Sequence, residues 1–161
     1  MAVRAATLKC QGTCYLAFTE KIYAQTSILI HPSSDDSFGL TVLEAMKGGC
    51  AIIASKMYAF PEMVEDRENG MLINPKYWMF TPEKIPNPIA WKHWKKRRLA
   101  LKKNSAFVLE IEEAIRTLYL DRKLLLSFSE KSFERANTKF GEDIICQQWN
   151  DVWQSMVRNE K

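Results

Sequence analysis

Residues 27–55 read SILIHPSSDDSFGLTVLEAMKGGCAIIAS, and this segment is the most informative about the fold. Two short apolar runs, at 27–31 and 50–55, flank a helical pattern at 40–47 that two glycines end. Neither apolar run alternates with polar residues, which is typical of strands buried on both faces of a parallel sheet. The stretch therefore predicts a strand, a loop, a helix and a second strand parallel to the first.

The same alternation continues on both sides of this stretch. We predict a weak strand at 7–11, a helix at 19–25, a helical turn at 60–66 and a last strand at 71–74. Apolar residues at helical spacing predict three further helices, near 107–118, 125–136 and 145–156. The expected fold class is α/β, a parallel sheet of about four strands with helices on both faces and a C-terminal helical segment.

Length and composition exclude several classes of protein. The 161 residues, 47% hydrophobic and 26% charged, are typical of one globular domain. No apolar run approaches the ~18 residues that a membrane-spanning helix needs. The four cysteines are interpreted as buried free thiols of a reducing, cytoplasmic compartment. The alternative is a metal site at Cys10 and Cys14, which lack a second pair of ligands nearby.

The loop between the first strand and the helix at 40–47 carries the candidate binding site. Ligands of open parallel sheets bind at the carboxyl ends of the strands, where this loop lies. Gly39 lets a ligand approach the backbone, and the helix start at Leu40 offers free N–H groups to a phosphate. Glu44 lies one helical turn later and suits a ribose diol, while Asp36 lies on the loop side. This arrangement fits a sugar nucleotide.

Each residue of this site also has a purely structural interpretation. Glu44 would otherwise be a solvated helix residue, and Asp36 a helix cap or a turn former. The structural interpretation of Gly39 is that it turns the chain, and this is compatible with its role in binding. His31, at the end of its strand, is interpreted as a packing residue rather than a catalytic base.

Residues 36–46, DSFGLTVLEAM, resemble the E-x7-E motif of retaining glycosyltransferases of the GT-B fold, with family 4 as the best match. Three more segments resemble this family in the same order, KIYAQTSILIHPS at 21–33, GGCAIIAS at 48–55 and FPEMVEDRENGMLINP at 60–75. The segment FGEDIICQQW at 140–149 resembles the closing helices of the same domain. The resemblance implies a Rossmann-like, C-terminal donor-binding domain that is truncated at its N-terminal side.

The resemblance also implies an activity and the residues that carry it. A sugar would pass, with retention, from a nucleotide-diphosphate sugar to an unidentified glycan or lipid-linked acceptor, with no metal and no further cofactor. Of the two catalytic acids, Glu44 would bind the ribose and Asp36 would contact hydroxyls of the donor sugar. The implied donor-binding residues are Ser37, Phe38, Gly39, Leu40, Thr41 and Glu44.

The sequence departs from the family pattern in three ways. Asp36 is one methylene shorter than the usual Glu, and Tyr58 and Ala59 replace a common pair of glycines. The acceptor domain is missing, and so is the Arg and Lys pair for the diphosphate, for which Arg4 and Lys9 are weak substitutes. We therefore expect a chain that begins midway through the donor domain and needs an N-terminal acceptor domain or subunit. The alternative is an inactive remnant or a partner subunit.

Residues 75–104 form a separate insertion between the α/β part at 1–74 and the C-terminal helices at 105–161. The segment 92–103 holds seven basic residues and no acid, and the rest of the chain has 16 Lys and Arg against 19 Asp and Glu. It is either a solvated insertion or a contact with an anionic membrane surface, and nucleic-acid binding is not expected. A membrane contact would make the protein peripheral at the inner face of the membrane, through Trp91, Trp94, Lys95, Lys96, Arg97 and Arg98.

Two tryptophans near the end of the chain have two interpretations. Trp149 and Trp153 lie on the predicted last helix, at a spacing that puts them on one face. They either pack against the rest of the domain or form an exposed apolar surface.

Overall fold

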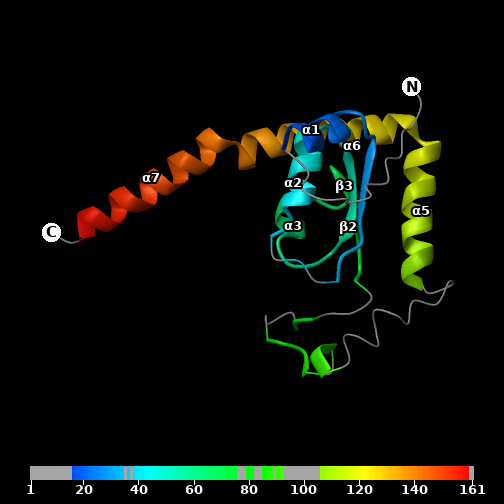
Figure 1. The fold of residues 1–161 in the computed structure, drawn as a ribbon, viewed down its shortest axis with the longest axis horizontal. Coiled ribbons are helices and arrows are strands. Elements are labelled where there is room, and N and C mark those ends of the chain that lie inside the picture. Colours follow the sequence, from blue (N-terminus) through cyan, green and yellow to red (C-terminus); the bar gives the residue numbers. More distant parts are fainter. Residues whose placement is uncertain are drawn as a thin grey trace.

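The computed structural model describes residues 16–34, 36, 38–75, 79–81, 85–88, 90–92 and 106–159. Its helices and strands alternate through the first half of the chain, and helices follow in the second half (Figure 1). The order is α1 (Leu16–Ala24), β1 (Ile28–His31), α2 (Leu40–Lys47), β2 (Ala51–Ser55), α3 (Phe60–Met63), β3 (Gly70–Ile73), α5 (Ala106–Leu120), α6 (Arg122–Phe140) and α7 (Glu142–Asn159).

The described strands form one parallel sheet in the order β1-β2-β3. Leu29 lies opposite Ile52, and Ile53 lies opposite Met71. All five residues of β2 are buried, as the absence of polar alternation predicted. The α/β fold class is confirmed, and the predicted strand at 7–11 lies outside the described residues.

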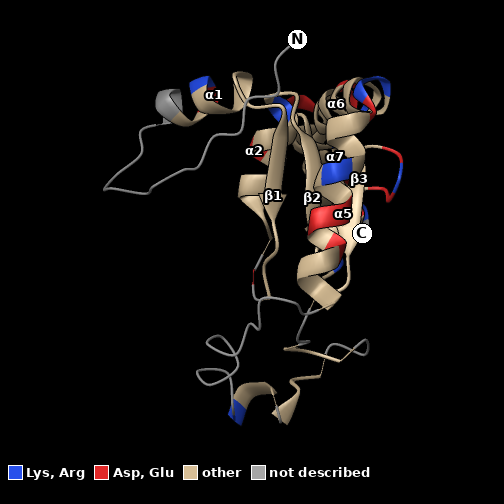
Figure 2. Ribbon diagram, turned by 90° about the vertical axis from the view of Figure 1, so that its right-hand side faces the viewer, with Lys and Arg blue, Asp and Glu red and all other residues tan. Residues whose placement is uncertain are grey.

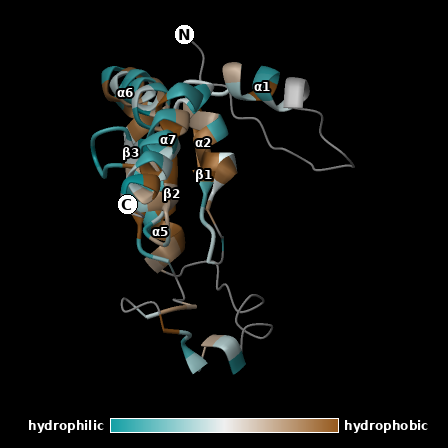
Figure 3. Cartoon of the chain, turned by 90° about the vertical axis from the view of Figure 1, so that its left-hand side faces the viewer, coloured by the Kyte–Doolittle hydropathy of each residue, from teal (hydrophilic) through white to brown (hydrophobic). Residues whose placement is uncertain are grey.

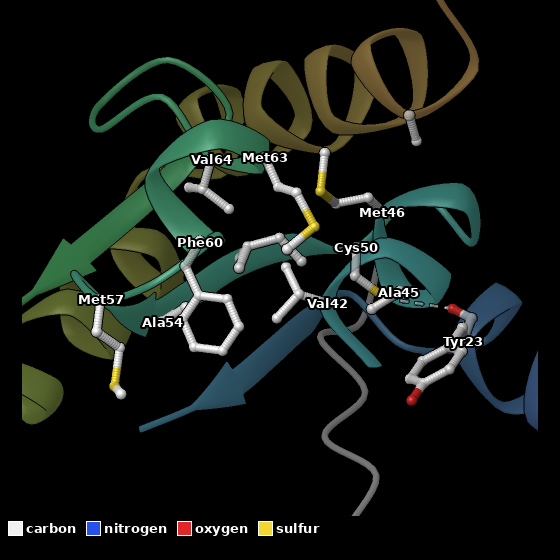
Figure 4. Close-up of a cluster of buried hydrophobic side chains, with 12 residues drawn as sticks. Tyr23, Val42, Ala45, Met46, Cys50, Ala54, Met57, Phe60, Met63 and Val64 are labelled. Carbon is white, nitrogen blue, oxygen red and sulfur yellow. Dashed lines mark hydrogen bonds between the residues drawn. The ribbon is translucent and has the colours of Figure 1, made fainter. Parts of the chain in front are cut away.

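Helices cover both faces of this sheet, as predicted. On one face, Ile52 and Ala54 pack with residues of α2 and α3, whose side chains point toward one another (Figure 4). On the other face, Ile53 and Met71 pack with residues of α5 and α6, among them Phe128. Each large apolar side chain buried in these layers stabilises the fold by about 1.5–3 kcal/mol.

Helix α6 lies across the end of the sheet where the strands begin. The Ser129 hydroxyl donates a hydrogen bond to the carbonyl of Gly49, shortly before β2. The Ser132 hydroxyl donates to the carbonyl of Asn69, directly before β3, at 2.8 Å. The carboxyl ends of the strands therefore lie away from α6, at the opposite end of the sheet (Figure 1).

Two helix boundaries differ from the prediction for identifiable reasons. Helix α3 was expected over 60–66 but ends at Met63, because Val64 takes an extended conformation with φ −110° and ψ 115°. The Asn69 side chain then holds the loop by accepting a hydrogen bond from the amide of Glu65 at 2.7 Å. Helix α6 begins before the expected position because Asp121 caps it, accepting a hydrogen bond from the amide of Leu124.

The last helix, α7, extends away from the rest of the molecule (Figure 1). Trp149 and Trp153 are 60% and 61% exposed. The interpretation that they pack against the domain is therefore wrong, and they belong to an apolar surface.

Figure 3 shows apolar residues gathered where the helices meet the sheet. No helix among the described residues has the length and apolarity needed to cross a bilayer.

Candidate functional site

The candidate site lies where β1 ends and α2 begins. Asp36 lies in the loop between them, and its carboxylate accepts a hydrogen bond from Nε2 of His31 at 3.1 Å. The two side chains are 23% and 24% exposed, so a ligand can reach them while they are partly shielded from water. The residue that caps α2 is Gly39, so Asp36 is not the helix cap that the sequence left open as an alternative.

Gly39 is required by its backbone conformation and by its neighbours. Its φ is +86°, a region that residues with a side chain rarely adopt. A Cβ built on Gly39 would lie 2.2 Å from the ring of Phe60 and 3.3 Å from the terminal methyl of Met63. The loop therefore passes directly over α3, and this close passage brings the start of α2 against the side chains of α3.

The first turn of α2 is open to a ligand. The carbonyl of Gly39 accepts the amide of Val42 at 2.9 Å, which begins the helix. The amides of Leu40 and Thr41 precede this bond and have no acceptor inside the helix. Phe38 and Leu40 are exposed beside them. The arrangement can receive an anion at a helix start, where the helix dipole is favourable.

Glu44 lies one helical turn after Leu40, as predicted. Its side chain is half-buried and forms no ion pair with any residue that the structure describes. The next residues, Ala45 and Met46, are fully buried and fix the orientation of this part of α2. The carboxylate is therefore available to a hydroxyl of a bound ligand. Ser37, the remaining predicted member of the site, lies outside the described residues.

His31 combines a packing contact that the sequence predicted with a hydrogen bond that it did not. Its ring meets the ring of Phe60 edge to face, with centroids 5.4 Å apart and an angle of 78° between the planes. The packing role predicted for His31 is thus confirmed, but the hydrogen bond to Asp36 was missed. A histidine five residues before an acid, across a loop with Pro32, was the only signal for it.

The loop after β2 is connected to the insertion by aromatic contacts. Tyr58, which replaces a glycine of the family pattern, has a φ of +49°. Its ring lies 5.7 Å from that of Phe80, which in turn lies 6.0 Å from that of Trp91. Trp91 is exposed, and its indole N–H donates to the carbonyl of Met79 at 3.0 Å. The other residues predicted for membrane contact lie outside the described residues, namely Trp94, Lys95, Lys96, Arg97 and Arg98, so that contact stays a prediction.

The cysteines fit the thiol interpretation only in part. Cys50 is buried, and burial raises the pKa of its thiol to about 12. The thiol donates a hydrogen bond to the carbonyl of Thr26 at 3.2 Å. Cys146 is a free thiol but is exposed, so the expectation that it is buried is wrong. Cys10 and Cys14 lie outside the described residues.

Similar proteins share this region of the sequence. Residues 17–106 match the family described as "Glycosyl transferases group 1". An exopolysaccharide phosphotransferase of Streptomyces coelicolor is 28% identical over 137 residues, which cover 84% of this chain and 11% of that protein. The sulfoquinovosyl transferase SQD2 of Arabidopsis thaliana is 38% identical over 56 residues, which cover 33% of this chain and 11% of that protein. The chain thus spans about a tenth of the length of these two relatives.

Solved structures share the fold. The C-terminal domain of a group 1 glycosyl transferase from Francisella tularensis is 26% identical, with a TM-score of 0.53, over 75% of this chain and 47% of that one. The Anabaena protein HepE, in complex with UDP-glucose, is 20% identical, with a TM-score of 0.63, over 88% of this chain and 31% of that one. The family match covers more than half of the chain. The chain therefore belongs to the glycosyl transferases group 1 family.

Proposed function

We propose that this chain is the donor-binding part of a retaining GT-B glycosyltransferase related to family 4. The observation that carries the proposal is the open start of α2 at the carboxyl end of β1, with Asp36 before it and Glu44 one turn inside it. This placement offers N–H groups to a diphosphate and a carboxylate on either side to hydroxyls. A nucleotide-diphosphate sugar has a matching arrangement, because its diphosphate lies between the ribose hydroxyls and the hydroxyls of the sugar.

Each residue has a defined part in this proposal. The amides at Leu40 and Thr41 receive the diphosphate, where the helix dipole contributes about 0.3–1 kcal/mol. Gly39 lets the ligand approach the backbone, because it has no Cβ. Glu44 accepts hydrogen bonds from the ribose diol, and Asp36 accepts one from a hydroxyl of the sugar.

The proposed reaction is the transfer of the sugar to an acceptor hydroxyl. The bond between the anomeric carbon and the diphosphate oxygen breaks, and a bond to the acceptor oxygen forms on the same face of the sugar. The proton of the acceptor hydroxyl passes to the departing diphosphate oxygen. The residues of this chain hold the donor in place and stabilise the negative charge that grows on the leaving diphosphate. No metal is expected in this scheme.

Similar proteins support the choice of substrate. HepE of Anabaena was solved with UDP and with UDP-glucose, and the pneumococcal O-GlcNAc transferase GtfA with UDP and GlcNAc. The Streptomyces relative acts in exopolysaccharide chemistry by its name, and a Klebsiella pneumoniae relative lies in a cps region. We therefore propose a glycan or a lipid-linked glycan as the acceptor. Because the chain spans a small part of these relatives, acceptor binding is assigned to other parts of the whole protein.

Ligand-observed NMR on the purified chain with UDP, GDP and ADP tests the proposal. We expect one nucleotide to bind and Glu44→Ala to weaken that binding about tenfold or more, because the ribose loses its charged acceptor. Glu110→Ala on α5 is the matched control, since Glu110 is an exposed helical glutamate outside the site. Absence of binding by every nucleotide, or equal binding by Glu44→Ala, contradicts the proposal.

A further inference from the structure

We infer that His31 is a positioning residue, whose imidazole N–H fixes one oxygen of Asp36 so that the other oxygen is directed to a hydroxyl of the donor sugar. The inference rests on the proposed function and assigns a task to a residue outside the acidic motif. Its basis is the bond between Nε2 of His31 and Oδ2 of Asp36, at 3.1 Å, together with the contacts that hold each partner.

His31 is anchored by the sheet and by the core. It is the last residue of β1 and lies opposite Ala54 of β2 in the parallel register. Its carbonyl accepts the amide of Ser33 at 2.9 Å, which turns the chain away directly after the strand. The edge-to-face contact with Phe60, which is fully buried, also restricts the movement of the imidazole ring. The imidazole is therefore a fixed donor rather than a mobile surface group.

Asp36 has no such anchor of its own. It lies in the loop before α2, outside any helix or strand. The only hydrogen bond of its side chain to a described residue is the one from His31. Without that bond, the side chain would choose among staggered rotamers, and binding a sugar would require it to give up that freedom. The His31 bond therefore prepares the carboxylate for the ligand before the ligand arrives.

The chemistry of the pair favours a hydroxyl ligand. An ionised carboxylate accepts through two oxygens, and His31 occupies only Oδ2. Because both side chains are about three-quarters buried, their hydrogen bond is stronger than one formed fully in water. The other oxygen accepts no hydrogen bond from any residue that the structure describes, which suits a sugar hydroxyl. A diphosphate, being negative, does not suit it and is received at the amides of α2 instead.

The test compares how tightly a nucleotide and its glucose ester bind. The probes are three matched pairs: UDP and UDP-glucose, GDP and GDP-glucose, ADP and ADP-glucose. In His31→Leu we expect about tenfold weaker binding of the glucose ester that wild type binds, and a change of less than about twofold for the free nucleotide. His31→Gln, whose side-chain amide can replace the Nε2 donor, should keep the glucose ester within about threefold of wild type.

Glu44→Ala gives the opposite control, because it should weaken the nucleotide and its glucose ester alike. If wild type binds no nucleotide at all, the proposed function fails, and this inference fails with it. The ratio of the affinity for the glucose ester to the affinity for the free nucleotide is the decisive quantity. If this ratio is the same in wild type and in His31→Leu, the positioning role alone is overturned. The same holds if His31→Leu weakens the free nucleotide as much as the ester, since this indicates a general structural role.

A second measurement examines the imidazole of the wild-type chain directly. Long-range ¹H–¹⁵N NMR of wild type reports which imidazole nitrogen carries the proton. His31→Gln identifies the signals, because the chain has only one other histidine, His93. We expect His31 to carry its proton on Nε2, toward Asp36. A neutral His31 with the proton on Nδ1 instead would overturn the inference.

Discussion

At the scale of single residues, two glycines with similar backbones have different neighbours. Gly39 has a φ of +86° and Gly49 a φ of +75°, so both adopt a left-handed conformation. A Cβ on Gly39 would overlap the ring of Phe60 at 2.2 Å, whereas a Cβ on Gly49 would meet only Oγ of Ser129, at 3.7 Å. A comparison of the alanine variants of these two glycines therefore separates the energy of backbone strain from the energy of overpacking.

We predict that Gly39→Ala destabilises the fold more than Gly49→Ala. Backbone strain alone costs about 1 kcal/mol in Gly49→Ala. In Gly39→Ala the displaced Phe60 ring adds an overpacking cost, for a total of about 2–4 kcal/mol. Urea unfolding followed by circular dichroism measures both values. Equal losses of stability in the two variants would show that the Phe60 ring moves aside freely.

The residues of the candidate site could be predicted from the sequence to different degrees. Gly39 and Glu44 follow from the helical pattern and its first turn, because helix geometry alone fixes their spacing. The bond between His31 and Asp36 does not follow from any local pattern. It depends on the path of the loop after Pro32 and on the position of Phe60, which comes from another part of the chain.

At the scale of elements, regular periodicity was the reliable signal. Helix α2 spans the predicted residues, and the three C-terminal helices appear where the apolar spacing placed them. The predicted α3 was too long because nothing local to its sequence shows that Asn69 ties the chain back to Glu65. The order of the strands and the position of α6 depend on contacts between distant segments. Periodicity carries no information about such contacts.

Arg135 of α6 donates several hydrogen bonds to the end of α3 and to the connection between α3 and β3. Nε of Arg135 donates to the carbonyl of Met63 at 2.8 Å, and its guanidinium also donates to the carbonyl of Glu62 at 2.9 Å. A third bond, at 2.6 Å, reaches the carboxylate of Glu65. The Arg135 side chain is mostly buried, and Figure 2 shows residues of both charges on α6 and on the neighbouring connection. These bonds hold the segment that ends α3, and α3 carries Phe60.

We predict that Arg135→Ala lowers the free energy of unfolding by about 2–4 kcal/mol, because it removes the hydrogen bonds of a charged, mostly buried donor to two carbonyls and to the Glu65 carboxylate. Lys131→Ala is the matched control on the same helix. Lys131 binds Glu68 and lowers the pKa of that carboxyl, but both groups are well exposed. Its removal should cost much less than the removal of Arg135, because exposed ion pairs contribute little to stability. Urea unfolding compares the two variants, and equal effects would show that α6 is held by its apolar face alone.

At the scale of the whole molecule, the two ends of the sheet have different tasks. Helix α6 covers the end where the strands begin, through its bonds to the residues before β2 and β3. The candidate site lies at the other end, beside the start of α2. Helix α6 forms no hydrogen bond or ion pair with a site residue that the structure describes, and Arg135 is connected to the site through α3, whose Phe60 packs against His31. Helix α7 belongs to neither end and extends from the body (Figure 1).

Helix α7 presents an apolar stripe with no partner among the described residues. Ile145, Trp149, Val152 and Met156 recur at spacings of four, three and four residues, the spacing of a coiled-coil seam. From Trp149 onward these side chains are exposed. The helix begins with Glu142 and Asp143 and has Arg158 in its last turn. An antiparallel pair of α7 helices from two copies would join the stripes and bring opposite charges together.

We therefore predict that this chain self-associates through α7. Sedimentation velocity over a range of concentrations should show a dimer whose share grows with concentration, because burial of the stripe removes apolar surface from water. Replacing Trp149 and Trp153 together by Gln should shift the chain to monomer without lowering its stability, since neither ring packs on the body. Asn150→Ala, on the polar side of α7, should leave the dimer unchanged. A wild-type chain that stays monomeric, or a double variant that still dimerises, would show that α7 does not join two copies.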